Sequence, residues 1–339
     1  MKLGRSSYQF ENVYLEGAAT VVGDMEAKGP LGNYFDIKKS DPYFGKKSWE
    51  QAETHMAELA VSKVFEKIGV YATDIDVAFG GDLVNQLVPT HYAMRLFDIP
   101  FMGVFSACAS AIESLILAST FLDKGLAKRA MTLTSSHNNM AEKQFRMPVE
   151  YGGPKGDTAQ YTATGAGASI LSTTPTNIKV ESATVGIIVD AMQKNPTDMG
   201  AAMAPAAAHT ISRHFKELGR TVNDYDLILT GDLASIGSPL LVDLLKKEGH
   251  EIENRHNDCG NMLYHAHQPT FAGGSGAGCV SIVTFSYVVE MLQTKQLNKV
   301  LIVGTGALLN ALIVTQKETI PCIAHAVALV SHDIGGKAL

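Results

Sequence analysis

Residues 103–136 read GVFSACASAIESLILASTFLDKGLAKRAMTLTSS, and a second version of this stretch follows later in the chain. Residues 273–306, GGSGAGCVSIVTFSYVVEMLQTKQLNKVLIVGTG, show the same plan at an offset of 170. Each stretch has a tight turn of small residues, then a helical segment, a loop that bears Lys or Arg, and an apolar strand. Recurrence of one such unit predicts an internally duplicated α/β protein.

Two further blocks repeat in the same order. Residues 62–83 align with 212–233 at an offset of 150, and eight of the 22 positions are identical. The strand-like segment 166–172 has a counterpart at 325–331. Strands that alternate with helices indicate a mixed, largely parallel sheet covered by helices. Three repeated blocks in one order favour duplication over chance similarity.

The repeat predicts two similar halves, residues 1–190 and 191–339. The first half carries an insertion, residues 137–164, between the predicted strands 129–135 and 166–172. Its counterpart in the second half, residues 307–324, is shorter. Long loops in compact domains often serve as lids or interface arms, so we expect the insertion to have a functional role.

The composition excludes several functions. The formal net charge is −6 without a long basic run, so nucleic-acid binding is not expected. The amino terminus lacks a signal-peptide core, and the most apolar stretch, 109–122, is too short to span a bilayer. The cysteines show no CxxC spacing, which argues against structural zinc and indicates a reducing compartment; they are Cys108, Cys259, Cys279 and Cys322.

A metal site and a cofactor are not expected. Residues 256–258, HND, lie near His265 and His267, but their spacing fits no standard zinc pattern. The surrounding stretch, 251–270, has the composition of a polar loop. The glycine loop 273–278 lacks the lysine of a nucleotide-binding P-loop, although its bare amides could hold a carboxylate.

Cys108 is the strongest candidate for chemistry. It follows a predicted strand, 101–106, and opens a helix that begins near Ala109. A thiol at a helix N-terminus faces the positive end of the helix dipole, which favours the thiolate. The small neighbours permit a tight strand-to-helix elbow. The alternative is a buried cysteine that acts only as a small hydrophobic residue.

The elbow SACASAIES, the segment TGAGASIL and the glycine loop, together with the two repeated halves, resemble the thiolase and ketoacyl synthase superfamily. The resemblance covers essentially the whole chain and implies a layered αβαβα fold of two mixed-sheet halves. It implies that the cysteine at the position of Cys108 is the acylated nucleophile. In that superfamily, a histidine after the first strand of the second half and a histidine or asparagine in the glycine loop complete the site.

This chain departs from that pattern at both partner positions. In TGDLAS, 230–235, Gly231 occupies the histidine position and Asp232 follows it. The glycine loop, 272–278, has neither histidine nor asparagine. Both groups that would stabilise an oxyanion are therefore missing, which favours binding over catalysis. Cys322 falls where thiolases place a second cysteine, and His325 follows it, so a condensing enzyme or acyltransferase with an altered base is the alternative.

More specifically, the chain resembles a family of stage V sporulation proteins from spore-forming bacteria. The resemblance implies a non-catalytic protein that binds dipicolinic acid, pyridine-2,6-dicarboxylate, for uptake into the developing spore. It further implies a peripheral location on the inner membrane of the spore or forespore and membrane proteins of the same sporulation group as partners. It leaves open whether calcium accompanies the ligand and whether the protein is a homodimer. The stretches that carry the resemblance include KGPLGNYFD (28–36), GGDLVNQ (80–86), SSHNNMAEKQFRMPVEYGG (135–153), TGDLASIGSPLL (230–241) and QKETIPCIAHAV (316–327).

The expected ligand pocket joins the elbow to the glycine loop. A flat aromatic dianion needs apolar walls and donors at both ends, which amides and an arginine fork can supply. An aspartate beside such a ligand would repel it unless the carboxyl is protonated, turned away or bridged by calcium. We expect the ligand-binding residues to be Cys108, Asp232, Gly274, Ser275, His325, Arg146 and Cys322.

Overall fold

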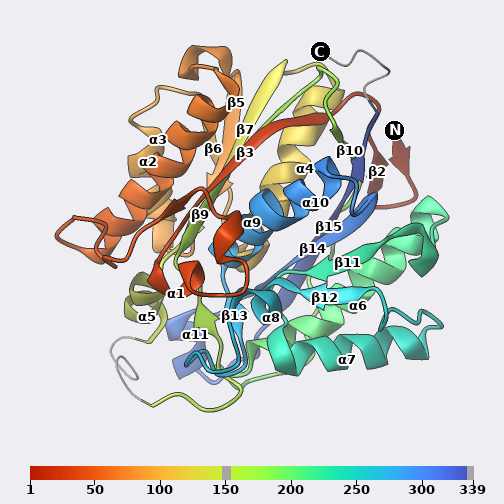
Figure 1. Ribbon diagram of the computed structural model, residues 1–339. Coiled ribbons are helices and arrows are strands. Elements are labelled where there is room, and N and C mark those ends of the chain that lie inside the picture. The colour runs from red at the N-terminus through yellow and green to blue at the C-terminus, as the bar shows by residue number, and fades with distance from the viewer. Residues whose placement is uncertain (147–153, 334–339) are drawn as a thin grey trace.

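A computed structural model describes residues 1–146 and 154–333. The first half forms a sheet with helices on both faces, coloured red to green in Figure 1. Its main strands are β3 (Tyr14–Val22), β5 (Val77–Gly81), β6 (Phe101–Gly103), β7 (Arg129–Ser136) and β9 (Gly165–Ser172). Its helices are α1 (Asp24–Ala27), α2 (Trp49–Ile68), α3 (Val88–Met94), α4 (Ser110–Asp123) and α5 (Asn138–Arg146). The short strands are β1 (Lys2–Leu3), β2 (Ser7–Gln9), β4 (Ile37–Lys38) and β8 (Tyr161–Thr162).

The second half repeats this layout. Its strands are β10 (Ile178–Thr184), β11 (Leu227–Thr230), β12 (His256–Asp258), β13 (Gly274–Ser275), β14 (Lys299–Ala307) and β15 (Cys322–Ser331). Its helices are α6 (Met199–Leu218), α7 (Ala234–Lys247), α8 (Cys259–Leu263), α9 (Ala277–Val283), α10 (Val289–Gln293) and α11 (Ala311–Thr315). A π-helical turn, Thr284–Val288, joins α9 to α10 without a break.

Strand order and direction are the same in the two halves. The first half reads β6-β5-β7-β9-β3, and the second reads β12-β11-β14-β15-β10. In each, the first three strands are parallel and the last two pair antiparallel. β3 and β10 meet at the pair Tyr14–Lys179, which joins the two sheets. The duplication that the sequence predicts is therefore present strand by strand, whereas the boundary at residue 190 stays a prediction.

Five layers follow from this arrangement, as Figure 1 shows. Helices α2 and α3 pack on the outer face of the first sheet, and α6 covers the outer face of the second with α7 packed against it. Between the sheets lie α4 and the continuous helix α9–α10, which share one apolar core with the inner faces of both. The αβαβα architecture predicted from the resemblance is thus confirmed. Within the described residues, no helix combines the length and hydropathy needed to cross a bilayer.

The repeated block at an offset of 150 forms the same structure twice. Helices α2 and α6 are each 20 residues long, and each ends at a glycine, Gly69 or Gly219. The φ angles of these glycines are +68° and +63°, a left-handed conformation that terminates a helix at little steric cost in glycine. A 3₁₀ turn follows in both copies, and an aspartate side chain caps it, Asp74 or Asp224.

An aspartate also locks the start of each following strand to its neighbour. Asp76 accepts hydrogen bonds from two consecutive backbone amides at residues 128–129, at 2.6 and 3.0 Å. Asp226 does the same with the amides at 298–299, at 2.6 and 3.0 Å. The identical aspartates of the repeat therefore have a structural role, because they satisfy amides at the entrance to β7 and β14.

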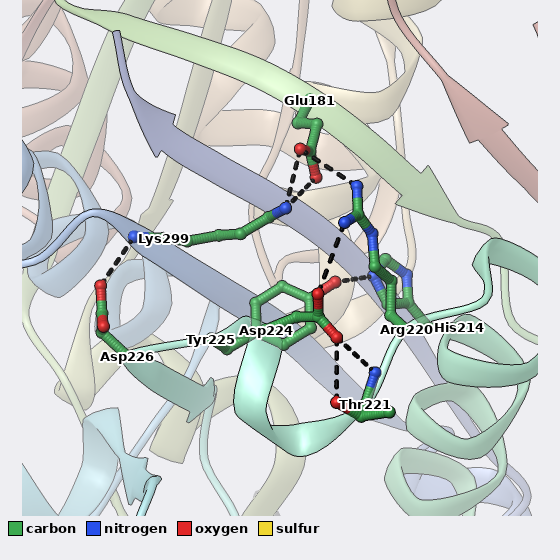
Figure 2. A network of polar contacts seen from close by, with 8 residues as sticks. All are labelled: Glu181, His214, Arg220, Thr221, Asp224, Tyr225, Asp226 and Lys299. Atoms are coloured by element: carbon green, nitrogen blue, oxygen red, sulfur yellow. Dashed lines mark hydrogen bonds and ion pairs between the residues drawn. The ribbon is translucent and has the colours of Figure 1, made fainter.

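Figure 2 shows the polar network around this point in the second half. Glu181 on β10 binds Lys299 at 2.7 Å and Arg220 at 3.3 Å, and the Lys299 ammonium lies 5.6 Å from the centre of the Tyr225 ring. Beneath it, His214 bonds the hydroxyl of Tyr225 at 2.7 Å. Burial lowers the pKa of His214 to about 3, so this histidine is neutral. The network fixes α6 to the sheet far from the cysteine elbow.

The stretch 251–270 is not the polar loop that its composition suggests. It contains β12, which extends the sheet in parallel to β11, and the short helix α8. Asp258 caps α8 by accepting hydrogen bonds from the amides of Gly260 and Asn261. A polar three-residue edge strand has no hydrophobic alternation, so sequence patterning misses it. No group of three or more His, Cys, Asp or Glu side chains among the described residues is placed to hold a metal ion.

Candidate functional site

Cys108 lies at the strand-to-helix elbow between β6 and α4. A 3₁₀ turn, Ala107–Ala109, leads into the helix, and Ala107 has a φ of +50°. This left-handed conformation is uncommon for a residue with a Cβ atom, and such strain persists only where the surroundings enforce it. The structure therefore contains the tight elbow that the small residues predict, and Cys108 is buried within it.

Three side chains from both halves meet at this point. The Cys108 sulfur lies 3.8 Å from the hydroxyl of Ser275, which donates a hydrogen bond of 2.8 Å to Asp232. Asp232 also accepts hydrogen bonds from the Thr305 hydroxyl at 2.5 Å and from the Gly276 amide at 3.2 Å. Cys108 opens α4, Asp232 follows β11, and Ser275 precedes α9. The repeated turns of the two halves thus converge on one buried cluster.

The environment keeps Cys108 protonated. Burial raises the pKa of its thiol well above the ordinary value, and the nearby carboxylate of Asp232 raises it further. Burial also raises the pKa of Asp232, although its hydrogen bonds to Thr305, Cys108 and Ser275 oppose the shift. The expectation of a thiolate at this helix N-terminus was wrong, because desolvation and a neighbouring acid outweigh the helix dipole.

A cavity of about 650 Å³ opens beside Cys108. Part of the lining comes from the insertion, at residues 141–145 and 160–162, and part comes from its counterpart, residues 306–323. Residues within the segments 83–85, 105–108 and 188–199, together with Ser275, complete the described lining. Among the described residues, the shorter counterpart therefore supplies more of this lining than the insertion does. Most of the lining is apolar, with a few convergent polar groups, as is usual in small-molecule sites.

Of the residues singled out in the sequence, Cys108, Ser275 and Cys322 line the cavity. Asp232 is fully buried behind Cys108 and Ser275 and is not among the lining residues. Cys322 begins β15, and its sulfur bonds the carbonyl of Ile320 at 3.4 Å. Burial raises the pKa of Cys322 to about 12, so it too carries a neutral thiol. That these residues contact a ligand stays a prediction.

The remaining three residues lie elsewhere or are not described. Gly274 is packed so that a Cβ atom there would lie 3.1 Å from the Tyr264 ring, and it is not among the lining residues. His325 also lies outside the lining; its Nδ1 accepts a hydrogen bond from the Gly186 amide at 3.1 Å, and burial lowers its pKa to about 4. Arg146 ends α5, and its side chain lies outside the described part of the chain.

The sequence analysis did not identify most of the lining. Asn85 follows the GDL turn of the first half, and Gln160 and Thr162 lie in the insertion. Gln160 also donates a hydrogen bond of 2.5 Å to the backbone carbonyl of Asp232, which ties the cavity wall to the buried cluster. The repeat could have indicated these lining residues, because the insertion and its counterpart occupy equivalent places in the two halves.

The chain has the thiolase-like fold, with two repeated halves and a cysteine at the elbow before α4, and solved structures agree. AbyA1, a tetronic acid condensing enzyme, superposes with a TM-score of 0.59 at 17% identity, covering 94% of this chain and 100% of that one. An OleA variant from Xanthomonas campestris gives 0.60 at 15% identity, covering 95% and 99%. A 3-oxoacyl-[acyl-carrier-protein] synthase III from Aquifex aeolicus gives 0.55 at 12%, covering 94% and 99%. At these identities the likeness establishes the fold alone.

The sequence profile described as Stage V sporulation protein AD (SpoVAD) matches residues 4–330. Stage V sporulation protein AD from Bacillus subtilis (strain 168) is 48% identical over 329 residues, which is 96% of this chain and 97% of that protein. The chain therefore belongs to the stage V sporulation protein AD family, and the resemblance drawn from its motifs is confirmed.

The buried cluster predicts how Cys108 reacts. In the wild type, iodoacetamide should alkylate Cys108 slowly, because the reactive thiolate is scarce. Asp232→Asn removes the adjacent negative charge and should raise the alkylation rate about tenfold for each unit by which the pKa falls. Peptide mass spectrometry of timed samples measures modification at Cys108 itself. The exposed Asp243→Asn is the matched control, and an unchanged rate in Asp232→Asn would contradict the assigned role of this carboxylate.

Proposed function

We propose that this protein binds dipicolinate, pyridine-2,6-dicarboxylate, in the cavity beside Cys108 and serves its uptake into the developing spore without turning it over. The observation that carries the proposal is the pairing of a ligand-sized, largely apolar cavity with a nucleophile position held as a neutral thiol. Family membership supports the link to sporulation. We place the protein in the spore, peripheral on the inner membrane, with membrane proteins of the same sporulation group as partners.

The cavity can accommodate a flat aromatic dianion. The first amides of a helix have no partner within it, so the amides of Ala107 and Cys108 can donate to a carboxylate, whereas that of Ala109 already bonds the carbonyl of Ser106. The amide of Asn85 and the hydroxyls of Thr162 and Ser275 add further polar contacts. Asp232 does not oppose the ligand directly, because Cys108 and Ser275 lie between it and the cavity and the hydroxyls of Ser275 and Thr305 already donate to its carboxylate.

The site is poorly equipped for acyl transfer, the alternative function. Cys322 and His325 were the candidate bases. The Cys322 thiol has a pKa of about 12, and His325 lies outside the lining with its Nδ1 already hydrogen-bonded. No histidine is among the described residues that line the cavity. Without a histidine beside it to take its proton, a protonated thiol attacks a thioester inefficiently.

Acyl-CoA assays provide a direct check on this conclusion. We expect neither thiolysis nor condensation above the uncatalysed rate, since losing one oxyanion-stabilising group alone lowers rates by about 10²–10³. Free CoA release is followed with a thiol reagent over acyl chains of several lengths. Turnover in the wild type that disappears in Cys108→Ala would overturn the non-catalytic assignment and support the acyltransferase alternative.

We further propose that the protein forms a homodimer through β6, the edge strand of the first sheet. Among the described residues β6 pairs with β5 alone, which leaves its other row of backbone groups open, and Met102 and the following Phe105 are about half exposed. Tyr92 and Leu96, on and just after α3, are exposed as well. Antiparallel pairing of β6 with a second copy would satisfy the edge and cover these side chains.

Substitution on β6 tests the dimer. Met102→Lys places a charge at the centre of the proposed interface and should shift the molar mass in light scattering from two chains to one. Leu126→Lys is a matched control, because Leu126 is also exposed but lies in the loop after α4. A wild-type mass of one chain, or an unchanged mass in Met102→Lys, would rule out this interface.

Calorimetric titration tests the ligand. Wild-type protein should bind dipicolinate, and the titration is run with and without calcium because the ligand itself chelates metals. Cys108→Trp fills the cavity and should abolish binding, whereas Cys108→Ser preserves the volume and should stay within a few-fold of wild type. Circular dichroism confirms that each variant is folded. Unchanged affinity in Cys108→Trp would place the ligand elsewhere, and no binding in the wild type would remove the ligand claim.

A further inference from the structure

The described lining of the cavity contains two charged side chains, Glu142 and Lys317. Glu142 is already neutralised, since the ammonium of Lys155 binds its carboxylate at 2.5 Å and both side chains are mostly buried. Lys155 is itself held over the rings of Tyr161 and Phe271. The Glu142–Lys155 ion pair is therefore a neutral part of the cavity wall. Among the described lining residues, this leaves Lys317 as the charged side chain that no opposite charge balances.

Lys317 is held in place by its backbone. It follows α11 with a φ of +58°, a left-handed conformation in which glycine would cause less strain. Its amide donates to the carbonyl of Val314 at 3.0 Å, and its carbonyl accepts from the ammonium of Lys194 at 3.0 Å. The side chain is exposed, and no hydrogen bond or ion pair of its ammonium is found among the described residues. The ammonium of Lys194 thus binds the backbone of the turn that carries Lys317.

The polar groups that line the cavity are of two kinds. Around Cys108, the donors are neutral amides and hydroxyls, with a buried acid behind them. Lys317, in the turn after α11, lines the same cavity with a cationic ammonium. A ligand with one carboxylate could be held by the neutral donors alone. A second carboxylate would need a cation, because desolvating an unpaired charge is costly.

We propose that Lys317 recognises the second carboxylate of the ligand and thereby makes the site selective for planar dicarboxylates over monocarboxylates. This inference rests on the proposed binding function and assigns specificity within the same cavity. Lys194 positions the Lys317 turn and adds positive potential beside it. The selectivity of the site is then set by α11 and the turn after it, not by the cysteine elbow.

Two ligands and four proteins test the inference. Calorimetry with dipicolinate and with picolinate, which lacks one carboxylate, is performed on the wild type, Lys317→Met, Lys317→Arg and Lys295→Met. Lys295 is the matched control, because it is an exposed lysine with a φ of +57° outside the cavity lining. Lys317→Met should weaken dipicolinate binding by about tenfold to a hundredfold, the range for a hydrogen bond to a charged group, and leave picolinate affinity within about twofold.

The other variants sharpen the expected pattern. Lys317→Arg should recover much of the dipicolinate affinity, and Lys295→Met should match the wild type. Added salt should weaken dipicolinate binding less in Lys317→Met than in the wild type. Thermal unfolding of each variant verifies that the fold is retained.

The possible failures are distinguishable. If the wild type prefers dipicolinate and Lys317→Met keeps that preference, the assignment of Lys317 is wrong while the binding function stands. If Lys317→Met loses both ligands equally, its role is structural and the specificity claim is wrong. If the wild type binds neither ligand, the proposed function fails and this inference fails with it.

Discussion

The close approach of the two inner helices to the opposite half is the constraint on which this structure depends. A Cβ atom on Gly304 of β14 would lie 2.6 Å from the side chain of Ile112 on α4, and one on Gly306 would lie 2.5 Å from the carbonyl of Ser106. In the other direction, a Cβ atom on Gly278 of α9 would lie 2.5 Å from the carbonyl of Gly165 on β9. Each helix can therefore pack against both sheets only because small residues occupy these contacts.

That packing explains both the location and the character of the site. The turns that open α4 and α9 meet where the halves touch, so Cys108, Ser275 and Asp232 are brought together from distant parts of the chain. The same packing excludes water from the cluster, and desolvation is the largest influence on the pKa values of both Cys108 and Asp232. A carboxylate in this setting withdraws reactivity from the cysteine, because it stabilises the protonated thiol.

The sequence predicts the parts of the fold that repeat and carry regular patterns. Apolar strands, glycine-terminated helices and the small-residue elbow recur at constant offsets, so duplication and the position of Cys108 follow from them. The sequence does not predict β12, because a short polar strand at the sheet edge shows no hydrophobic alternation. It also does not predict the protonation state of Cys108, which depends on Asp232 from the other half of the chain. Apart from Cys322, the cavity wall at 306–323 was also missed, since contacts between loops arise only from the packing of the halves.

The elbow cluster and the cavity walls are anchored in different parts of the fold. The elbow cluster is fixed by two sheets and the inner helices, so changes there disturb the core, as the close glycine contacts show. The cavity walls come from loops at equivalent positions of the two halves, outside that core, and such loops tolerate substitution far better. The proposed binding function therefore draws on two separable features. The acid beside Cys108 favours the protonated thiol, whereas the loops determine which side chains face the cavity.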